Sequence, residues 1–261
     1  MQTRTLANGL RICYLPKEGF SKTFAILATD FGSVDASFTF EGKRYDTPAG
    51  VAHFLEHKMF EDEDGNALQK FARTGASPNA FTSHTMTAYH FSCTDRFEEN
   101  LKILLKFVFT PYFTDENVEK ERGIINQEIR MVEDTPNWEV FVGAYEGLYR
   151  NHPVRVSIPG SEESISHITP ELLYTVTVRF TVRRTWHSWC AAQRTSSRYA
   201  AWQRRFHRRT HPRSVSVITA SARGSPSVVV TREKCRCRCR SAWSALRTYR
   251  FRPEKAVCAA V

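Results

Sequence analysis

The chain has no long hydrophobic segment. Among its 261 residues there is no run of 18 or more apolar ones, which is close to the length that a membrane-spanning helix needs. The first residues also lack the basic stretch followed by an apolar stretch that is typical of a secretory signal peptide. We therefore expect no membrane span and interpret the chain as cytoplasmic.

Acidic residues and leucine almost disappear from the last third of the chain. Residues 176–261 contain no Asp, no Asn and one leucine, with 20 basic residues against two acidic ones. Residues 1–175 hold 17 Lys and Arg against 25 Asp and Glu, so the two parts carry net charges of −8 and +18. A folded domain needs far more leucine-class core than the second part offers. We predict a folded domain over residues 1–175 and a basic, disordered tail over residues 176–261.

The first part carries a short motif suited to metal chemistry. Residues 50–57 end in H-x-x-E-H, the zincin motif in reverse order. In a helix, His53 and His57 lie one turn apart on one face and can hold one zinc ion, which in catalytic sites takes three protein ligands. Glu56 lies at the rim of that face, where it can take a proton from water without binding the metal. The motif indicates metal-assisted hydrolysis of a peptide bond, although its spacing alone also fits two surface histidines.

A third ligand is expected from a later helix. Val118, Ile125 and Ile129 recur at helical spacing and predict a buried stripe. Glu128 lies on this helix and is the best candidate for the third ligand. Glu121 precedes it by two turns on the same face, so it can support the site from behind the ligands.

These segments resemble the insulinase–pitrilysin zinc metallopeptidases, relatives of the mitochondrial processing peptidase, over about residues 5–175. The resemblance is carried by the H-F-L-E-H motif and by residues 8–11, 75–82, 87–91 and 121–131. It is greatest to the shorter bacterial, cytoplasmic members. It implies one zinc ion per chain on His53, His57 and Glu128, with Glu56 as general base and Glu121 as supporting acid.

The resemblance also concerns the substrate. Asn79, Ala80, Phe81 and Thr82 look like the family's edge strand, on which a substrate peptide adds as an extra strand. Asn79 is open to a second interpretation, a turn residue after Ser77-Pro78. Family members enclose the peptide with a homologous second half, in the same chain or in a partner chain.

The expected fold class is α+β, an antiparallel sheet with helices packed on one face, as in one metallopeptidase half-domain of this family. Hydrophobic periodicity predicts strands at residues 6–15, 23–29 and 81–93, and helices at 49–60, 66–74, 97–108 and from a cap at Thr114 to 132. We assign no ligand role to the other histidines considered: His84, His90, His152 and His167. Cys13 and Cys93 are expected to be small buried hydrophobes.

The resemblance stops where the composition changes, and the codons offer an explanation. If the third base of each codon is joined to the first two of the next, residues 175–191 can read C-Y-R-T-F-Y-S-P-S-N-M-A-L-V-V-C. In the same offset, residues 234–242 can read M-P-V-S-V-P-L-G, and both readings look like family segments. Our hypothesis is that one base deleted at the codon of Thr175 makes residues 176–261 a frameshifted tail. The pattern of Cys235, Cys237 and Cys239 then reflects shifted codons.

The predicted function is a zinc-dependent metalloendopeptidase that acts on peptides or unfolded segments. We expect the chain as given to be truncated and weakly active or inactive, because the second half and the sheet strand of the other frame are missing. Two alternatives stay open: a non-catalytic partner subunit of a processing-peptidase-like assembly, and non-specific nucleic-acid binding through the basic tail. The expected partners are a peptide and a homologous half or subunit, with no membrane.

Overall fold

The computed structural model describes residues 2–180 except 7, 8, 18 and 41, together with residues 186–192 and 215–216. Most of the predicted tail, including Cys235, Cys237 and Cys239, lies outside the described residues. The description below concerns the first of the two units of the chain, Met1–Val228.

A six-stranded sheet forms the base of this unit, in the order β1-β2-β10-β3-β9-β8. Its strands are β1 (Gln2–Thr5), β2 (Arg11–Pro16), β3 (Thr23–Thr29), β8 (Ser77–Thr82), β9 (Thr87–Cys93) and β10 (Trp186–Ala192). All neighbours are antiparallel except β2 and β10, which run parallel. The α+β class is confirmed, with a mixed sheet where a purely antiparallel one was expected.

The single strand predicted over residues 81–93 is wrong, because this stretch is part of a hairpin. A tight turn, in which the backbone N–H of Ser83 donates to the carbonyl of Met86 over 2.8 Å, separates β8 from β9. Ala80 therefore lies opposite Tyr89, and Asn79 lies opposite His90. The smaller sheets are formed by β4 (Ser37–Phe40), β5 (Lys43–Asp46) and β11 (Val215–Ser216), and by β6 (Glu61–Asp62) and β7 (Gly65–Asn66).

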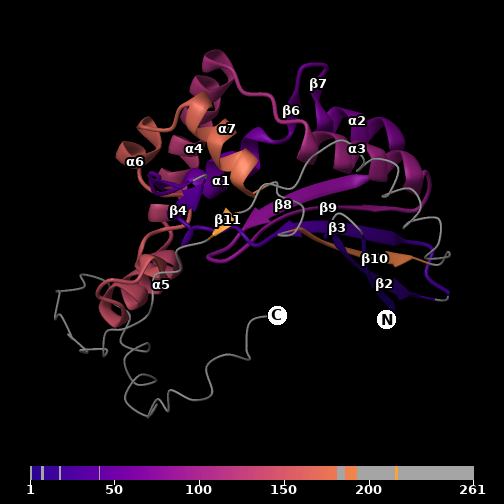
Figure 1. The fold of residues 1–261 in the computed structure, drawn as a ribbon, viewed down its shortest axis with the longest axis horizontal. Coiled ribbons are helices and arrows are strands. Elements are labelled where there is room, and N and C mark those ends of the chain that lie inside the picture. Colours follow the sequence, from indigo (N-terminus) through magenta and orange to yellow (C-terminus); the bar gives the residue numbers. More distant parts are fainter. Residues whose placement is uncertain are drawn as a thin grey trace, which may run out of the picture. The chain divides into compact units, whose positions relative to one another are not determined.

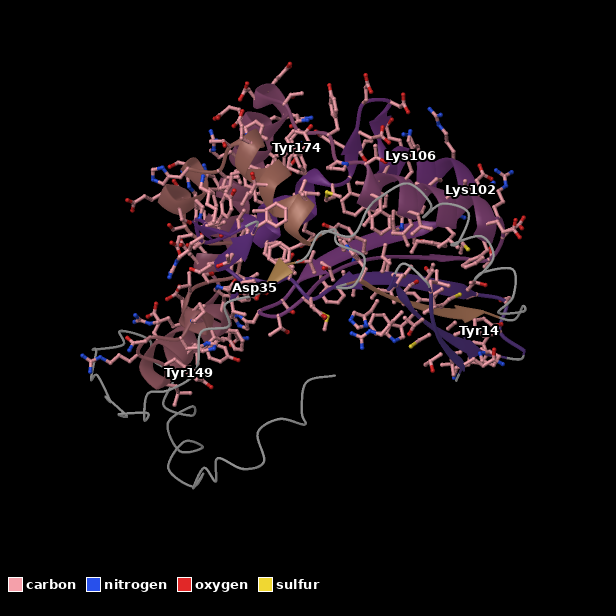
Figure 2. The ribbon with its side chains drawn as sticks, viewed as in Figure 1. Tyr14, Asp35, Lys102, Lys106, Tyr149 and Tyr174 are labelled. Carbon is pink, nitrogen blue, oxygen red and sulfur yellow. The ribbon has the colours of Figure 1, made fainter. Side chains whose placement is uncertain are left out.

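Helices α1 (Val51–Lys58), α2 (Ala67–Thr74) and α3 (Phe97–Phe109) cover one face of the large sheet, and α4 (Asp115–Glu133), α6 (Glu162–Ser166) and α7 (Pro170–Phe180) lie on the same side of it (Figure 1). Helix α5 (Pro136–Leu148) lies apart, beyond the end of the sheet, and has no buried residues; the 3-10 helix η1 (Pro153–Arg155) follows it. The core lies between the two layers, where the ring of Phe71 is 5.6 Å from that of Phe91. Lys102 and Lys106 lie on the side of α3 that faces away from the sheet (Figure 2).

The helix predicted from a cap at Thr114 is confirmed as α4. The hydroxyl of Thr114 accepts a hydrogen bond from the backbone N–H of Asn117, and the Asn117 side chain accepts one from the backbone N–H of Thr114. This reciprocal pair satisfies two of the free donors at the start of the helix. In the part of the chain that the structure describes, none of the helices is both long and apolar enough to cross a bilayer.

The folded part continues beyond Thr175, contrary to the expected boundary. Helix α7 runs on to Phe180, whose side chain is buried with that of Val176. Strand β10 then lies between β2 and β3, so the expected lack of a strand here is wrong. Its side chains alternate between the two faces of the sheet, with Trp186, Ser188 and Cys190 buried. The strand can form in spite of the composition because strand pairing uses backbone groups that every sequence supplies.

Two glycines fix the start of α1. Gly50, the N-cap, has φ 88°, and a Cβ built there would lie 2.3 Å from the carbonyl oxygen of Pro159. At Gly160, with φ +79°, a Cβ would lie 2.6 Å from the carbonyl oxygen of Ala49. The two segments can cross this closely only because neither residue carries a side chain.

Gly50→Ala is therefore expected to destabilise the fold by about 3 kcal/mol or more, from the left-handed backbone and the steric overlap together. The matched control is Gly75→Ala, because Gly75 has φ +71° but nothing within 4 Å of its built Cβ. Urea unfolding of both variants measures the difference. Equal losses in the two variants would contradict the role of the close crossing.

Candidate metal centre

Helix α1 carries the inverted motif into the interior of the protein. Phe54 is fully buried and Leu55 is 7% exposed, and both pack in the core. His53 and Glu56 are also buried, at 9% and 8% exposure. A buried polar side chain is costly unless other groups satisfy it, so the partners of these residues define the site.

Helix α4 brings Glu128 to the two histidines of α1. Nε2 of His53 lies 3.5 Å from Oε1 of Glu128, and Nε2 of His57 lies 3.4 Å from its Oε2. In the described part of the chain, ligand atoms of these three residues lie within 4.8 Å of one another and could hold a metal ion. Two imidazoles and one carboxylate form a donor set of catalytic zinc sites.

Nε2 of His53 faces Glu128, so it is the nitrogen through which His53 would bind. Nδ1, on the other side of the ring, is buried and has no hydrogen-bond partner in the described structure. The three predicted ligands are thus brought together as the sequence pattern required. His84, His90, His152 and His167 are not part of the group.

Glu121 stands behind His57. Its Oε1 lies 3.0 Å from Nδ1 of His57, so that nitrogen donates and Nε2 is directed to Glu128. Burial lowers the pKa of His57, but hydrogen bonds to Glu121 and Glu128 outweigh it and raise the pKa to about 10. Hydrogen bonds from His53 and His57 hold the pKa of Glu128 well below its usual range. The metal-free site therefore keeps a proton that a metal ion must displace.

Glu56 does not belong to the ligand group and faces the edge strand instead. The hydroxyl of Thr82, the last residue of β8, donates to Oε2 of Glu56 over 2.7 Å. Tyr89 is fully buried nearby, and burial followed by the negative charge of Glu56 raises its pKa well above the usual value. The carboxylate of Glu56 is thereby fixed between the metal centre and β8.

The predicted substrate strand lies at an edge of the sheet. Strand β8 has β9 on one side and is the last strand in the order. Asn79 and Phe81 are exposed, whereas Ala80 and Thr82 are half-buried. Asn79 lies within the strand, so its interpretation as a turn residue is wrong.

Two contacts of the site were not foreseen from the sequence. One is the hydrogen bond from Thr82 to Glu56, which depends on the hairpin turn after β8. The other is Lys58, which follows His57 on α1 and is fully buried. The sequence gives no signal for the burial of Lys58, because a lysine in a helix is ordinarily solvated and half of the residues of Val51–Lys58 are polar.

Comparison with known proteins agrees with this geometry. Residues 39–162 match the family model described as insulinase (peptidase family M16). The uncharacterized zinc protease YmfH of Bacillus subtilis (strain 168) is 53% identical over 171 residues, which cover 65% of this chain and 40% of the relative. The probable mitochondrial-processing peptidase subunit beta of Schizosaccharomyces pombe is 31% identical over 177 residues, or 65% of this chain and 36% of the relative.

A solved structure extends the match to the backbone. The putative M16-like peptidase from Alicyclobacillus acidocaldarius has a TM-score of 0.79 and 37% identity, over 83% of this chain and 51% of that one. The fold and the site define an α+β half-domain of the metallopeptidase type. Over residues 39–162 the chain matches the insulinase family, peptidase family M16, and it spans about half the length or less of these relatives.

The raised pKa of His57 predicts a pH-dependent stability of the metal-free protein. Because the pKa rises from 6.5 to about 10 on folding, the imidazolium stabilises the fold fully below pH 6.5, and this stabilisation is lost as the pH rises through 10. The free energy of unfolding, measured by urea titration with a chelator present, should fall across this window. His57→Gln should give a flatter profile, and equal slopes for the two proteins would contradict the assignment.

Proposed function

We propose that this chain supplies the metal-binding half of a zinc metalloendopeptidase. The observation that carries the proposal is the convergence of His53, His57 and Glu128, with Glu56 beside them and outside the ligand group. A purely structural metal site would have no need of an additional carboxylate directed at the edge strand. The named peptidase relatives support the same reaction class.

Each residue has a role in this proposal. A zinc ion on His53, His57 and Glu128 would polarise the carbonyl of a peptide bond and lower the pKa of a water molecule. Glu56 takes a proton from that water and passes it to the leaving amine. Its hydrogen bond from Thr82 keeps the carboxylate in place between the water and the substrate strand. Glu121 orients His57 through Nδ1.

The substrate class follows from β8. An edge strand has main-chain groups that no neighbouring strand uses, and an extended peptide can pair with them. Residues Asn79 to Thr82 end beside Glu56, so a peptide paired with them would run past the carboxylate that moves the proton. Peptides and unfolded segments fit such an edge, whereas a folded substrate cannot supply a free extended strand.

A second half completes the enzyme in this proposal. The chain covers 40% of YmfH and 51% of the Alicyclobacillus peptidase, and the S. pombe relative is named as a subunit. We propose that a homologous half, in the same chain or in a partner, closes over the substrate. The chain by itself then cleaves peptides slowly or not at all, because nothing fixes the far side of the substrate.

Zinc binding tests the first part of the proposal. Calorimetric titration is expected to give one zinc ion per chain, and Glu128→Gln to weaken that binding strongly because one of three ligands changes. Glu56→Gln serves as the matched control, since Glu56 is adjacent to the site but is not a ligand, and it should keep the zinc affinity of the unaltered chain. Failure of the unaltered chain to bind zinc would sink the peptidase proposal and favour a non-catalytic subunit.

Peptide cleavage tests the second part. An unstructured peptide incubated with the purified, zinc-loaded chain is expected to be cleaved at a rate near background. Rapid cleavage that is lost in Glu56→Gln would overturn the need for a second half while keeping the reaction assignment.

We further propose that the coding frame shifts at the codon of Thr175. Strand β10 coincides with the apolar segment A-L-V-V-C that the other frame reads over residues 186–191, which supports the proposal. Sequencing the coding DNA tests this hypothesis. An intact frame in close relatives that encodes the present residues 176–261 would refute it.

A further inference from the structure

Lys58 is the most deeply buried charged side chain next to the metal centre. It follows His57 at the end of α1, and its side chain has 0% exposure. Nζ donates to Oε2 of Glu61 over 2.5 Å and lies 3.8 Å from Oε2 of Glu121. An ammonium group without water needs carboxylates around it, so the positions of these three side chains depend on one another.

The contacts of Glu121 divide between its two oxygens. Oε1 lies 3.0 Å from Nδ1 of His57, and Oε2 faces the ammonium of Lys58. A carboxylate attracted from both ends cannot rotate away from the imidazole without losing one of the two interactions. The ring of His57, in turn, keeps Nε2 directed to Glu128, 3.4 Å away.

We propose that Lys58 is a positioning residue of the metal centre, which acts through Glu121 to fix the ring of His57. The inference rests on the proposed function, because it concerns how tightly and in what geometry zinc is held. Residues behind the ligands typically change metal affinity by about 10–100-fold when they are replaced. Lys58 acts one step further back, through the residue that contacts the ligand.

The alternative explanation is structural: Lys58 serves only to neutralise the charge of Glu61. Glu61 begins β6 and has a second cation nearby, since Nζ of Lys120 lies 3.8 Å from its Oε1. The side chain of Lys120 is 69% exposed, so water screens its charge, and its ammonium group forms no ion pair with the neighbouring Glu121 in the described structure. It is therefore a matched control for charge near Glu61.

The experiment measures zinc affinity by chelator competition and the visible spectrum of the cobalt-substituted protein, with the full chain throughout. Lys58→Met is expected to weaken zinc binding about 10-fold or more and to change the cobalt spectrum. Lys120→Met is expected to leave both unchanged. In a Glu121→Gln background, Lys58→Met should change the zinc affinity little further, because the carboxylate through which Lys58 acts on His57 is already absent.

The paired variant Lys58→Met with Glu61→Met separates the two explanations and also covers a failure of the single variant to fold. It replaces the buried ion pair by apolar side chains, which proteins often tolerate, and thermal unfolding checks the fold. Positioning predicts that zinc affinity stays about 10-fold or more below that of the unaltered chain. Recovery of unaltered affinity and cobalt spectrum in the paired variant, or an unaltered result in Lys58→Met, would overturn the inference. A chain that binds no zinc before any substitution would instead remove the proposed function.

Discussion

The burial of α1 is the constraint on which the site depends. An eight-residue helix with two histidines, a glutamate and a lysine is packed into the interior, where unpartnered polar groups are costly. Helix α4 supplies Glu121 and Glu128 as partners for the histidines, and β8 supplies the hydroxyl of Thr82 as a partner for Glu56. The helix, the long helix beside it and the edge strand therefore take their relative positions from the same set of polar contacts. The glycine crossing at Gly50 fixes where this helix begins.

Much of the site could be predicted because local rules and geometry agree there. The spacing of His53 and His57 determines that they share a helix face, and the apolar stripe of α4 determines which side Glu128 takes. Lys58 could not be assigned in this way. One lysine in a helix is ordinarily a solvated residue, and only the tertiary contacts with Glu61 and Glu121 show that it is buried.

The fold was harder to predict where the alternation of side chains continues through two successive strands, β8 and β9. Alternation from Phe81 to Cys93 suggests one strand, but the turn at Ser83–Met86 reverses the chain and keeps the alternation. Composition also misled beyond Thr175. The scarcity of leucine argued against structure, yet β10 pairs through its backbone with both neighbours. The backbone of β10 is paired on both sides, but its side chains are not all satisfied: the buried Nε1 of Trp186 has no hydrogen-bond partner in the described structure.

The open edge of β8 has a consequence for the behaviour of the chain in solution. Main-chain donors and acceptors do not distinguish one extended segment from another, so the edge that we propose for a peptide can also receive the same edge of a second copy. Phe81, 41% exposed at that edge, favours such contact. A second copy of the chain would then compete with the proposed peptide for the same row of main-chain groups, and covering β8 would also protect the chain against self-association.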